Sequence, residues 1–254
     1  MPELSVVIIT YNEERNIARC LESVKEIADE IIVVDSFSTD KTKIICESFD
    51  AKVIEHLFEG HIRQKNFAIS QATFPHQLSL DADEALSAEL ITEIKKVKQN
   101  WVADGYLMNR LANYCGKWIR HCGWYPDTKL RLYDSRKGLW TGLDPHDRFE
   151  MEPETKLEFL PGNLLHYTYY TIDEHILQSN KFSTIAAHAL TEKGNPVFFV
   201  QIFINPIAKF IRNYFLRLGF LDGFYGFIIC QSAAHETFLK YVKAWQIKKS
   251  DRKD

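Results

Sequence analysis

Two carboxylates stand one residue apart at the end of a short apolar run, in the stretch Leu78-Ser79-Leu80-Asp81-Ala82-Asp83-Glu84. Because side chains of an extended chain alternate between faces, Asp81 and Asp83 are predicted to point to one spot. Such a pair can hold a hard divalent cation, since Mg²⁺ takes one or two protein carboxylates and fills its other positions with phosphate and water. Asp-x-Asp also occurs in ordinary polar turns, so the pair alone leaves both interpretations open.

Polar side chains also follow two earlier apolar runs. Residues 4–9 and 31–34 are nearly continuous β-branched and aliphatic stretches, typical of central strands that are covered on both faces. Tyr11 comes just after the first run and Asp35 directly after the second. A structural alternative exists for each, because Asp35 could cap a helix and Tyr11 could be a half-buried aromatic at the rim of the sheet.

Helical patterns separate these strands. Asn12 is placed to cap the first helix, further helices are predicted over residues 40–49 and 61–72, and residues 53–54 form a short strand. This alternation predicts a parallel sheet with right-handed crossovers, in which ligands bind beyond the carboxyl ends of the strands. The sequence contains neither G-x-G-x-x-G after the first strand nor G-x-x-x-x-G-K-[ST] anywhere, which disfavours a dinucleotide oxidoreductase and a P-loop phosphotransferase.

The pattern of residue types changes after residue 100. Strands are predicted near residues 105–108, 130–133, 157–160 and 164–167, and a loop over residues 114–125 is dense in aromatic and basic side chains. Aromatic rings interleaved with cations suit sugar stacking and phosphate pairing. An aromatic mini-core beneath a long loop explains the same composition equally well.

The last third is predicted to be helical. Residues 173–193 carry the apolar stripe Ile176, Leu177, Phe182, Ile185 and Ala189. Residues 197–249 are rich in Phe and carry seven basic and two acidic side chains, a balance of +5. Basic amphipathic helices of this kind suit the interface of an anionic leaflet. Covering the sheet or forming a homodimer is the alternative.

Composition further limits the classes of protein to which the chain can belong. The 254 residues are 46% hydrophobic and 26% charged, which predicts a folded chain, and the net charge of −3 gives no support to nucleic-acid binding. The five cysteines contain no Cys-x-x-Cys pair and suit a reducing cytosolic setting. We identify no signal peptide and no apolar run long enough for a spanning helix.

Three linked motifs, in order and spacing, resemble the family 2 glycosyltransferases of the GT-A fold. They are residues 6–13 (VVIITYNE), residues 30–42 (EIIVVDSFSTDKT) and residues 80–84 (LDADE). Residues 116–119, 123–127 and 129–133 resemble more closely the acceptor segment of the lipopolysaccharide core β-glycosyltransferases, including β-1,4-glucosyltransferases. The resemblance covers residues 3–170 well and the helical tail more loosely.

The resemblance implies roles for individual residues. Thr10, Tyr11, Glu13, Asp35, Lys65 and Asp81 would bind the nucleotide-sugar, with Lys65 meeting the diphosphate. Asp83 and His166 would hold a divalent metal, Mg²⁺ or Mn²⁺, although a lone His near a strand end is otherwise usually structural. Lys117, Trp118, Trp124 and Arg131 would bind the acceptor.

The reaction implied is an in-line displacement of a nucleoside diphosphate with inversion. The attacking hydroxyl needs a carboxylate base within hydrogen-bond reach. Asp147 of His146-Asp147 stands where many relatives have His-Glu, a departure that shortens the side chain by one methylene. Glu84 and Glu150 are the alternatives for this role.

The sequence as a whole therefore predicts an α/β GT-A fold with a mostly parallel sheet flanked by helices and a C-terminal helical extension. Residues 1–170 form the catalytic domain, with a nucleotide-sugar half at 1–100 and an acceptor half at 101–170, and residues 171–254 form the extension. The expected enzyme transfers a hexose, glucose, from a UDP-sugar to a lipid-linked glycan at the cytoplasmic face of the inner membrane. A nucleotidyltransferase, or a sugar-binding module without catalysis, is the alternative.

Overall fold

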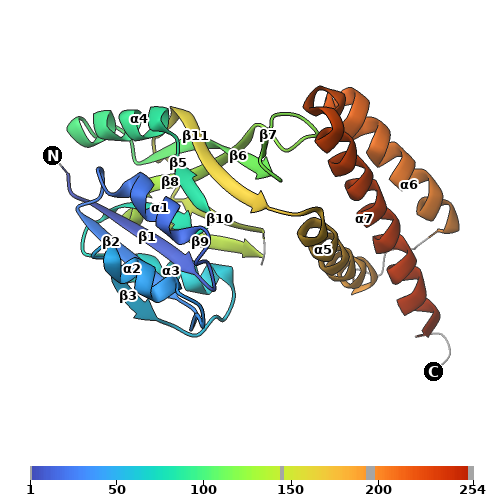
Figure 1. Cartoon of the computed structure of the whole chain (residues 1–254), viewed down its shortest axis with the longest axis horizontal. Coiled ribbons are helices and arrows are strands. Elements are labelled where there is room, and N and C mark those ends of the chain that lie inside the picture. The colour runs from blue at the N-terminus through green and yellow to red at the C-terminus, as the bar shows by residue number, and fades with distance from the viewer. Residues whose placement is uncertain (1, 144–145, 193–197, 251–254) are drawn as a thin grey trace. The chain divides into compact units, whose positions relative to one another are not determined.

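The computed structural model describes residues 2–143, 146–192 and 198–250, and the chain forms two compact units (Figure 1). The first unit consists of Met1–Leu111 and Asp127–Tyr167, and the second of Ala112–Pro126 and Thr168–Asp254. The sequence predicts a single boundary at residue 170. The chain instead passes from one unit to the other after residues 111, 126 and 167, so the segment 112–126 belongs with the helical residues.

The N-terminal part of the first unit alternates strands and helices, as predicted. Its strands join in the order β3-β2-β1-β4, and all three pairings are parallel. The elements are β1 (Leu4–Thr10), α1 (Ile17–Val24), β2 (Glu30–Asp35), α2 (Thr42–Ser48), β3 (Lys52–Glu55), α3 (His61–Ser70) and β4 (His76–Asp81).

The later strands extend the same sheet in the order β8-β6-β11-β5, with β7 paired to β6. The β4–β8, β6–β8, β6–β7 and β5–β11 pairings are antiparallel, in contrast to the three parallel pairings among the first four strands. The elements are β5 (Glu84–Leu86), α4 (Ala88–Gln99), β6 (Gly105–Tyr114), β7 (Lys117–Ile119), β8 (Asp127–Asp134), η1 (Ser135–Lys137), β9 (Gly138–Leu143), β10 (His146–Met151) and β11 (Leu157–Tyr169). Strands β9 and β10 form a separate two-stranded sheet.

Strand β1 is buried on both faces, which confirms the prediction from its continuous apolar run. Val6 and Ile8 pack in the main core with Leu21 of α1. Val7, on the opposite face, packs with Ala68 of α3 in a second cluster. Because helices cover both sides, residues 6–9 are apolar on both faces, and polar side chains occur toward the ends of the strand, with Ser5 near its start and Thr10 at its carboxyl end.

The second unit is mainly helical and contains α5 (Ile172–Glu192), α6 (Phe199–Ile211), the π-helical turn η2 (Arg212–Leu216), the 3₁₀ turn η3 (Gly219–Asp222) and α7 (Gly223–Ser250). Helix α7 packs against both α5 and α6. The core of this unit gathers Tyr114, Ile119 and Cys122 with Ile229 and Cys230 of α7. No helix within the described residues combines the length and apolarity needed to cross a bilayer.

Helix α5 buries a different face from the one its apolar stripe suggests. Its buried side chains are His175, Ser179, Ser183 and Ala187. Ile176 and Leu177 of the stripe are instead exposed, at 53% and 70%. The small residues recur every four positions and allow close approach of α7, whereas the stripe leaves apolar surface in contact with solvent.

We expect His175 to make the second unit sensitive to acid. It is buried beside Tyr114, whose hydroxyl lies 3.0 Å from Nδ1, and burial lowers the pKa of His175 to about 4. The unfolded chain protonates this ring near pH 6.5, so it binds more protons than the folded chain between pH 6.5 and 4. The stabilisation is therefore complete above pH 6.5 and decreases by up to about 3 kcal/mol as the pH falls toward 4.

Urea denaturation at pH 7.5 and pH 5 tests this expectation. His175→Gln, which keeps a polar partner for Tyr114 but cannot titrate, should be less stable than the parent at pH 7.5 and lose less stability on acidification. Equal pH slopes in the two proteins would show that His175 does not carry the effect.

Candidate active site

The ends of three parallel strands meet at one edge of the sheet. Thr10 pairs with Asp35 across β1 and β2, and Ile9 pairs with Asp81 across β1 and β4. The register therefore places the polar residues that follow the apolar runs side by side, as the strand pattern predicts. Thr10 and Asp35 are both buried at this edge.

The loops after β1 and β2 are tied together by side chains. Asn12 does not cap a helix, because α1 begins only at Ile17, and its Oδ1 accepts from the backbone N–H of Thr39 at 2.8 Å. The Asp35 carboxylate accepts from both the backbone N–H and the hydroxyl of Ser38 in this loop, and it does not cap α2, which begins at Thr42. Tyr11 is 58% exposed, so its ring is available at the rim of the sheet.

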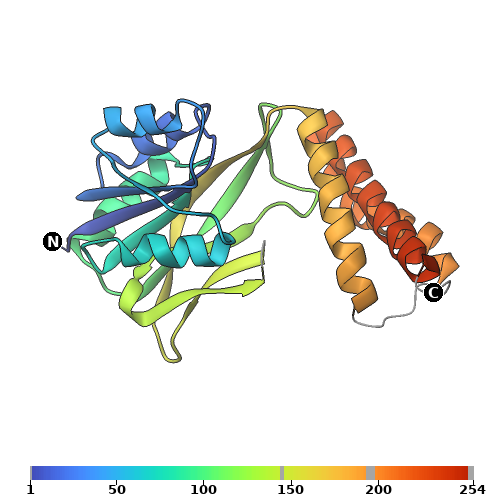
Figure 2. The ribbon, with the colours of Figure 1, turned by 90° about the horizontal axis from the view of Figure 1, so that it is seen from below.

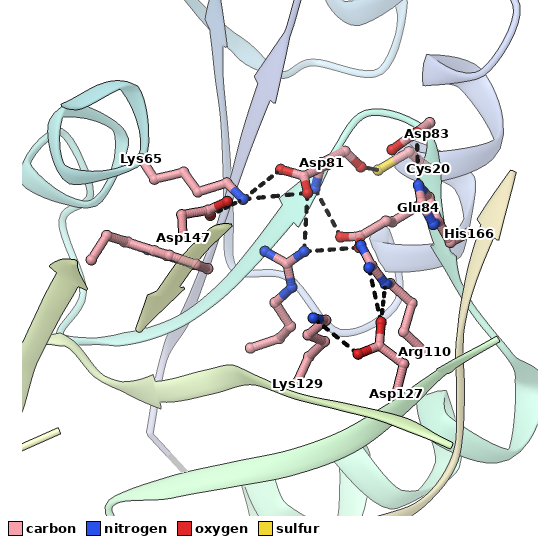
Figure 3. Close-up of polar contacts among 12 residues, drawn as sticks. Cys20, Lys65, Asp81, Asp83, Glu84, Arg110, Asp127, Lys129, Asp147 and His166 are labelled. Atoms are coloured by element: carbon pink, nitrogen blue, oxygen red, sulfur yellow. Dashed lines mark hydrogen bonds and ion pairs between the residues drawn. The ribbon is translucent and has the colours of Figure 1, made fainter. Parts of the chain in front are cut away.

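Lys65 joins two carboxylates from distant parts of the chain (Figure 3). It comes from α3, is 2% exposed, and its Nζ lies 3.0 Å from Asp81 and 2.7 Å from Asp147. The ring of Trp140 lies 4.5 Å from the same ammonium group. Burial opposes ionisation of Asp81, but the charges of Lys65 and Arg131 outweigh it and hold the pKa of Asp81 well below its usual range.

Arg131 braces Asp81 from the other side. It is 3% exposed, and its Nη2 donates to Asp81 at 3.0 Å and to Glu84 at 2.8 Å. Glu84 is itself buried and accepts from the backbone N–H of Asp81 at 3.0 Å. Arg131, predicted to bind the acceptor, thus fixes the carboxylate of Asp81, and Glu84 is held in the same network.

Asp83 does not share a partner with Asp81, contrary to the expectation from an extended Asp-x-Asp. Residues 82–83 form a turn between β4 and β5, which removes the strand alternation that the expectation assumed. The Asp83 Oδ2 lies 3.0 Å from Nε2 of His166 (Figure 3). Strand β11 brings His166 there, because it pairs with β5 so that His166 stands opposite Glu84.

The two groups predicted to hold a metal are therefore adjacent. Burial opposes protonation of His166, but Asp83 outweighs it, so the pKa of His166 is raised. Burial raises the pKa of nearby Glu13, and the charge of Asp83 adds to the effect. Within residues 2–143, 146–192 and 198–250, no third His, Cys, Asp or Glu completes a metal-binding group. One carboxylate and one imidazole still fit a cation that takes its remaining ligands from phosphate and water.

The β9–β10 hairpin positions Asp147. Figure 2 shows this hairpin beside α3, where Asn66 bonds both the backbone N–H and the carbonyl of Trp140. Phe149, two residues from Asp147 on the same face of β10, stacks on Tyr133 with ring centroids 3.5 Å apart. These contacts hold the hairpin so that Asp147 reaches Lys65.

Glu150 lies on the other face of the same strand. It is exposed and accepts from Thr141 at 2.7 Å and from Arg148 at 3.1 Å. Of the carboxylates considered as base, Asp147 is thus the one that contacts Lys65 in the cleft, whereas Glu84 is engaged by Arg131.

Lys65, Asp81 and Asp147 line a cleft of about 470 Å³ within the first unit. Its charged lining consists of the carboxylates Asp81 and Asp147 and the cations Lys65, Arg110, Lys129, Arg131 and Arg148. Asp127 pairs with Arg110 at 2.8 Å and with Lys129 at 3.0 Å. Sequence reasoning missed Arg110 and the contact of Glu84 with Arg131, since no local motif signals residues that meet only through strand pairing. Lys129 lies in the recognised segment 129–133 but was given no role.

The other predicted acceptor residues lie in the second unit. Lys117 donates to the backbone carbonyl of Asp222 at 2.6 Å. Trp124 packs on the aromatic core, edge-on to Tyr114 at 5.9 Å between ring centroids. Trp118 is partly buried on β7. The aromatic mini-core therefore accounts for Trp124. Lys117, Trp118 and Trp124 belong to the second unit, whereas the cleft lined by Lys65, Asp81 and Asp147 belongs to the first.

Comparisons with known proteins give the family. Residues 5–149 match the model of the family described as glycosyl transferase family 2. An uncharacterised glycosyltransferase of Rickettsia typhi is 32% identical over 99% of this chain and 90% of its own. The lipopolysaccharide core biosynthesis glycosyltransferase LpsC of Rhizobium meliloti is 34% identical over 96% of this chain and 92% of its own.

The fold has a solved counterpart. The mannosyltransferase PcManGT of Pyrobaculum calidifontis, solved with GDP-mannose and Mn²⁺, superposes with a TM-score of 0.53 at 16% identity, over 97% of this chain and 88% of that one. This likeness confirms the GT-A fold predicted from the strand pattern. The carboxylates at the strand ends, the match to the family model and the fold all point to the same family. The chain belongs to glycosyl transferase family 2 and is a glycosyltransferase.

Proposed function

We propose that this glycosyltransferase moves glucose, with inversion, from a UDP-sugar to a lipopolysaccharide-core or other cell-envelope glycan. The main support is that Lys65, Asp81, Asp83, Asp147 and His166 gather around the strand ends of one unit, where α/β sheets bind their ligands. The acceptor class is supported by the similarity to LpsC over nearly the whole of both chains.

Asp83 and His166 would hold the divalent metal, Mg²⁺ or Mn²⁺. Such a cation would neutralise charge that develops on the departing diphosphate, a contribution worth several kcal/mol. Lys65 is the second positive group at this edge, and its buried ammonium would exchange a carboxylate partner for a phosphate oxygen. Arg131 would keep Asp81 ionised and oriented toward the donor.

Asp147 would act as the base. It would accept the proton of the acceptor hydroxyl while that oxygen bonds to the anomeric carbon and the bond to the diphosphate breaks. Its ion pair with Lys65 places it in the same cleft as Asp81. Thr10, Tyr11, Glu13 and Asp35 would hold the nucleoside at the adjoining edge.

Arg131 of the first unit is proposed to contact the acceptor, and Lys117, Trp118 and Trp124 of the second unit are proposed as separate acceptor-binding residues. We further propose a peripheral location on the cytoplasmic face of the inner membrane through the C-terminal helices. Its support is the exposed apolar surface of α6, which includes Phe199, Val200, Phe203, Ile204 and Ile207.

A thermal-shift screen identifies the donor. We expect UDP-glucose with Mn²⁺ to raise the melting temperature, whereas GDP- and ADP-sugars should have little effect, because a ligand of the folded state stabilises it by mass action. At a ligand concentration one hundred times Kd the stabilisation is about 2.7 kcal/mol. Selective stabilisation by a GDP- or ADP-sugar would contradict the donor assignment.

A further inference from the structure

A pocket in the second unit carries positive charge that the catalytic cleft does not use. It has a volume of about 400 Å³ and is lined by Arg120, His121, Tyr125, Leu216, Arg217 and Leu218, among others. Within the described part of the chain, no carboxylate forms an ion pair with Arg120 or Arg217. Arg120 lies over the ring of Tyr125, 5.6 Å from its centroid.

Buried contacts build this pocket. The Asp222 carboxylate is 4% exposed and accepts from the backbone N–H groups of Arg120 and His121, at 3.3 and 2.8 Å. The ring of His121 lies 3.1 Å from the same carboxylate. The Asp222 carboxylate is thus engaged by the pocket's own backbone and by His121, so it does not neutralise either guanidinium group.

Gly123 makes room for Arg217. Its φ is +80°, and a Cβ at this position would lie 2.1 Å from Nη1 of Arg217. The backbone carbonyl of Arg217 in turn accepts from the N–H of Cys122 at 3.1 Å. Any side chain at position 123 would therefore displace the guanidinium group. The absence of a side chain at Gly123 and the hydrogen bond from Cys122 together position Arg217 at the pocket.

The rim of the pocket is apolar and exposed. Leu216 and Leu218 are 75% and 44% exposed, and Phe215, Leu221 and Phe224 nearby in the chain are exposed as well. Water-exposed side chains of this size favour transfer to an apolar phase by about 25 cal/mol per Å². An anion pocket enclosed by such side chains matches the boundary between phosphate and acyl chains in a bilayer.

We propose that Arg120 and Arg217 bind the phosphate of an anionic phospholipid while Leu216 and Leu218 enter the acyl region. This proposal deepens the peripheral location proposed above and rests on it. A lipid is favoured over a soluble phosphate because a soluble ligand would not bury the rim. Two guanidinium groups suit phosphate oxygens, which they can bond through paired N–H groups.

Vesicle sedimentation with the full-length protein tests the proposal. The parent should bind phosphatidylglycerol vesicles and should bind pure phosphatidylcholine at least tenfold more weakly. Arg120→Gln/Arg217→Gln should weaken binding to phosphatidylglycerol at least tenfold, and Leu216→Gln severalfold. Lys25→Gln/Lys96→Gln removes the same charge from two exposed positions of the first unit and should change binding less than twofold.

Three results would overturn the proposal. They are equal loss in the control pair, absence of phosphatidylglycerol binding by the parent, and full displacement from vesicles by millimolar sn-glycerol 3-phosphate, which would indicate a soluble ligand. Near-UV circular dichroism of each variant establishes that it is folded. UDP release with a soluble acceptor separates the lipid-binding proposal from the proposed transfer of glucose. It should persist in the arginine variants, because they lose only lipid binding. Absence of UDP release in the parent would refute only the proposed function.

Discussion

Asp83→Asn is expected to lower the rate of sugar transfer by roughly a thousandfold. The amide keeps the size of the side chain but removes the negative charge that faces His166 at 3.0 Å. Loss of that charge should weaken binding of the divalent cation and leave the developing charge on the diphosphate uncompensated. UDP release measures the rate, and Mn²⁺ binding in the presence of UDP, followed by electron paramagnetic resonance, measures the cation directly.

Asp50→Asn provides the matched control, since Asp50 is an exposed carboxylate of the same unit outside the cleft. It should retain parental rates and Mn²⁺ binding. The backbone hydrogen bond that the Tyr167 N–H donates to the Asp83 carbonyl persists in Asp83→Asn, so the variant should still fold. Full activity of the parent in EDTA, or unchanged Mn²⁺ binding in the variant, would refute the metal role of Asp83.

Asp147→Asn is expected to abolish turnover while sparing the donor. General-base catalysis contributes about 10²–10⁴-fold, and an amide cannot accept the proton of the acceptor hydroxyl. Loss of its charge also frees Lys65, which is otherwise 2.7 Å from the carboxylate, so affinity for UDP-glucose should stay the same or increase. Single-turnover kinetics and calorimetric titration with UDP-glucose and Mn²⁺ measure the two quantities separately.

Glu150→Gln is the companion variant on the opposite face of β10. Its carboxylate bonds Thr141 and Arg148 at the surface, so its removal should leave the transfer rate nearly unchanged. Retained turnover in Asp147→Asn together with a loss in Glu150→Gln would move the base to Glu150. Retained turnover in both would leave Glu84, which Arg131 now holds, as the carboxylate to examine.

The features formed by residues close together in the chain follow from the sequence. Continuous apolar runs such as residues 4–9 require cover on both faces, and the alternation with helices determines the parallel order of the first four strands. Asp35 and Asp81 stand at the carboxyl ends of such runs, which is why they were predicted at one edge. The family followed from the same motifs, because their order and spacing are local properties of the chain.

Other features depend on contacts between segments far apart in the chain. Asp83 meets His166, 83 residues away in sequence, only because β11 pairs with β5. A turn at residues 82–83 separates Asp83 from Asp81. Arg131 and Lys65 reach Asp81 from β8 and α3. No spacing within the sequence encodes these pairings.

The face that α5 buries was likewise decided by its neighbour. The apolar stripe with Ile176 and Leu177 predicts one face, but contact with α7 selects the small side chains Ser179, Ser183 and Ala187. Hydrophobic periodicity reports which side chains would gain from burial, whereas the distance between packed helices decides which side chains fit. The sequence by itself therefore determined the first four strands, the edge and the family, whereas the two strands predicted at 157–160 and 164–167 are one strand, β11. Tertiary packing decided which charges meet and which apolar surface stays exposed.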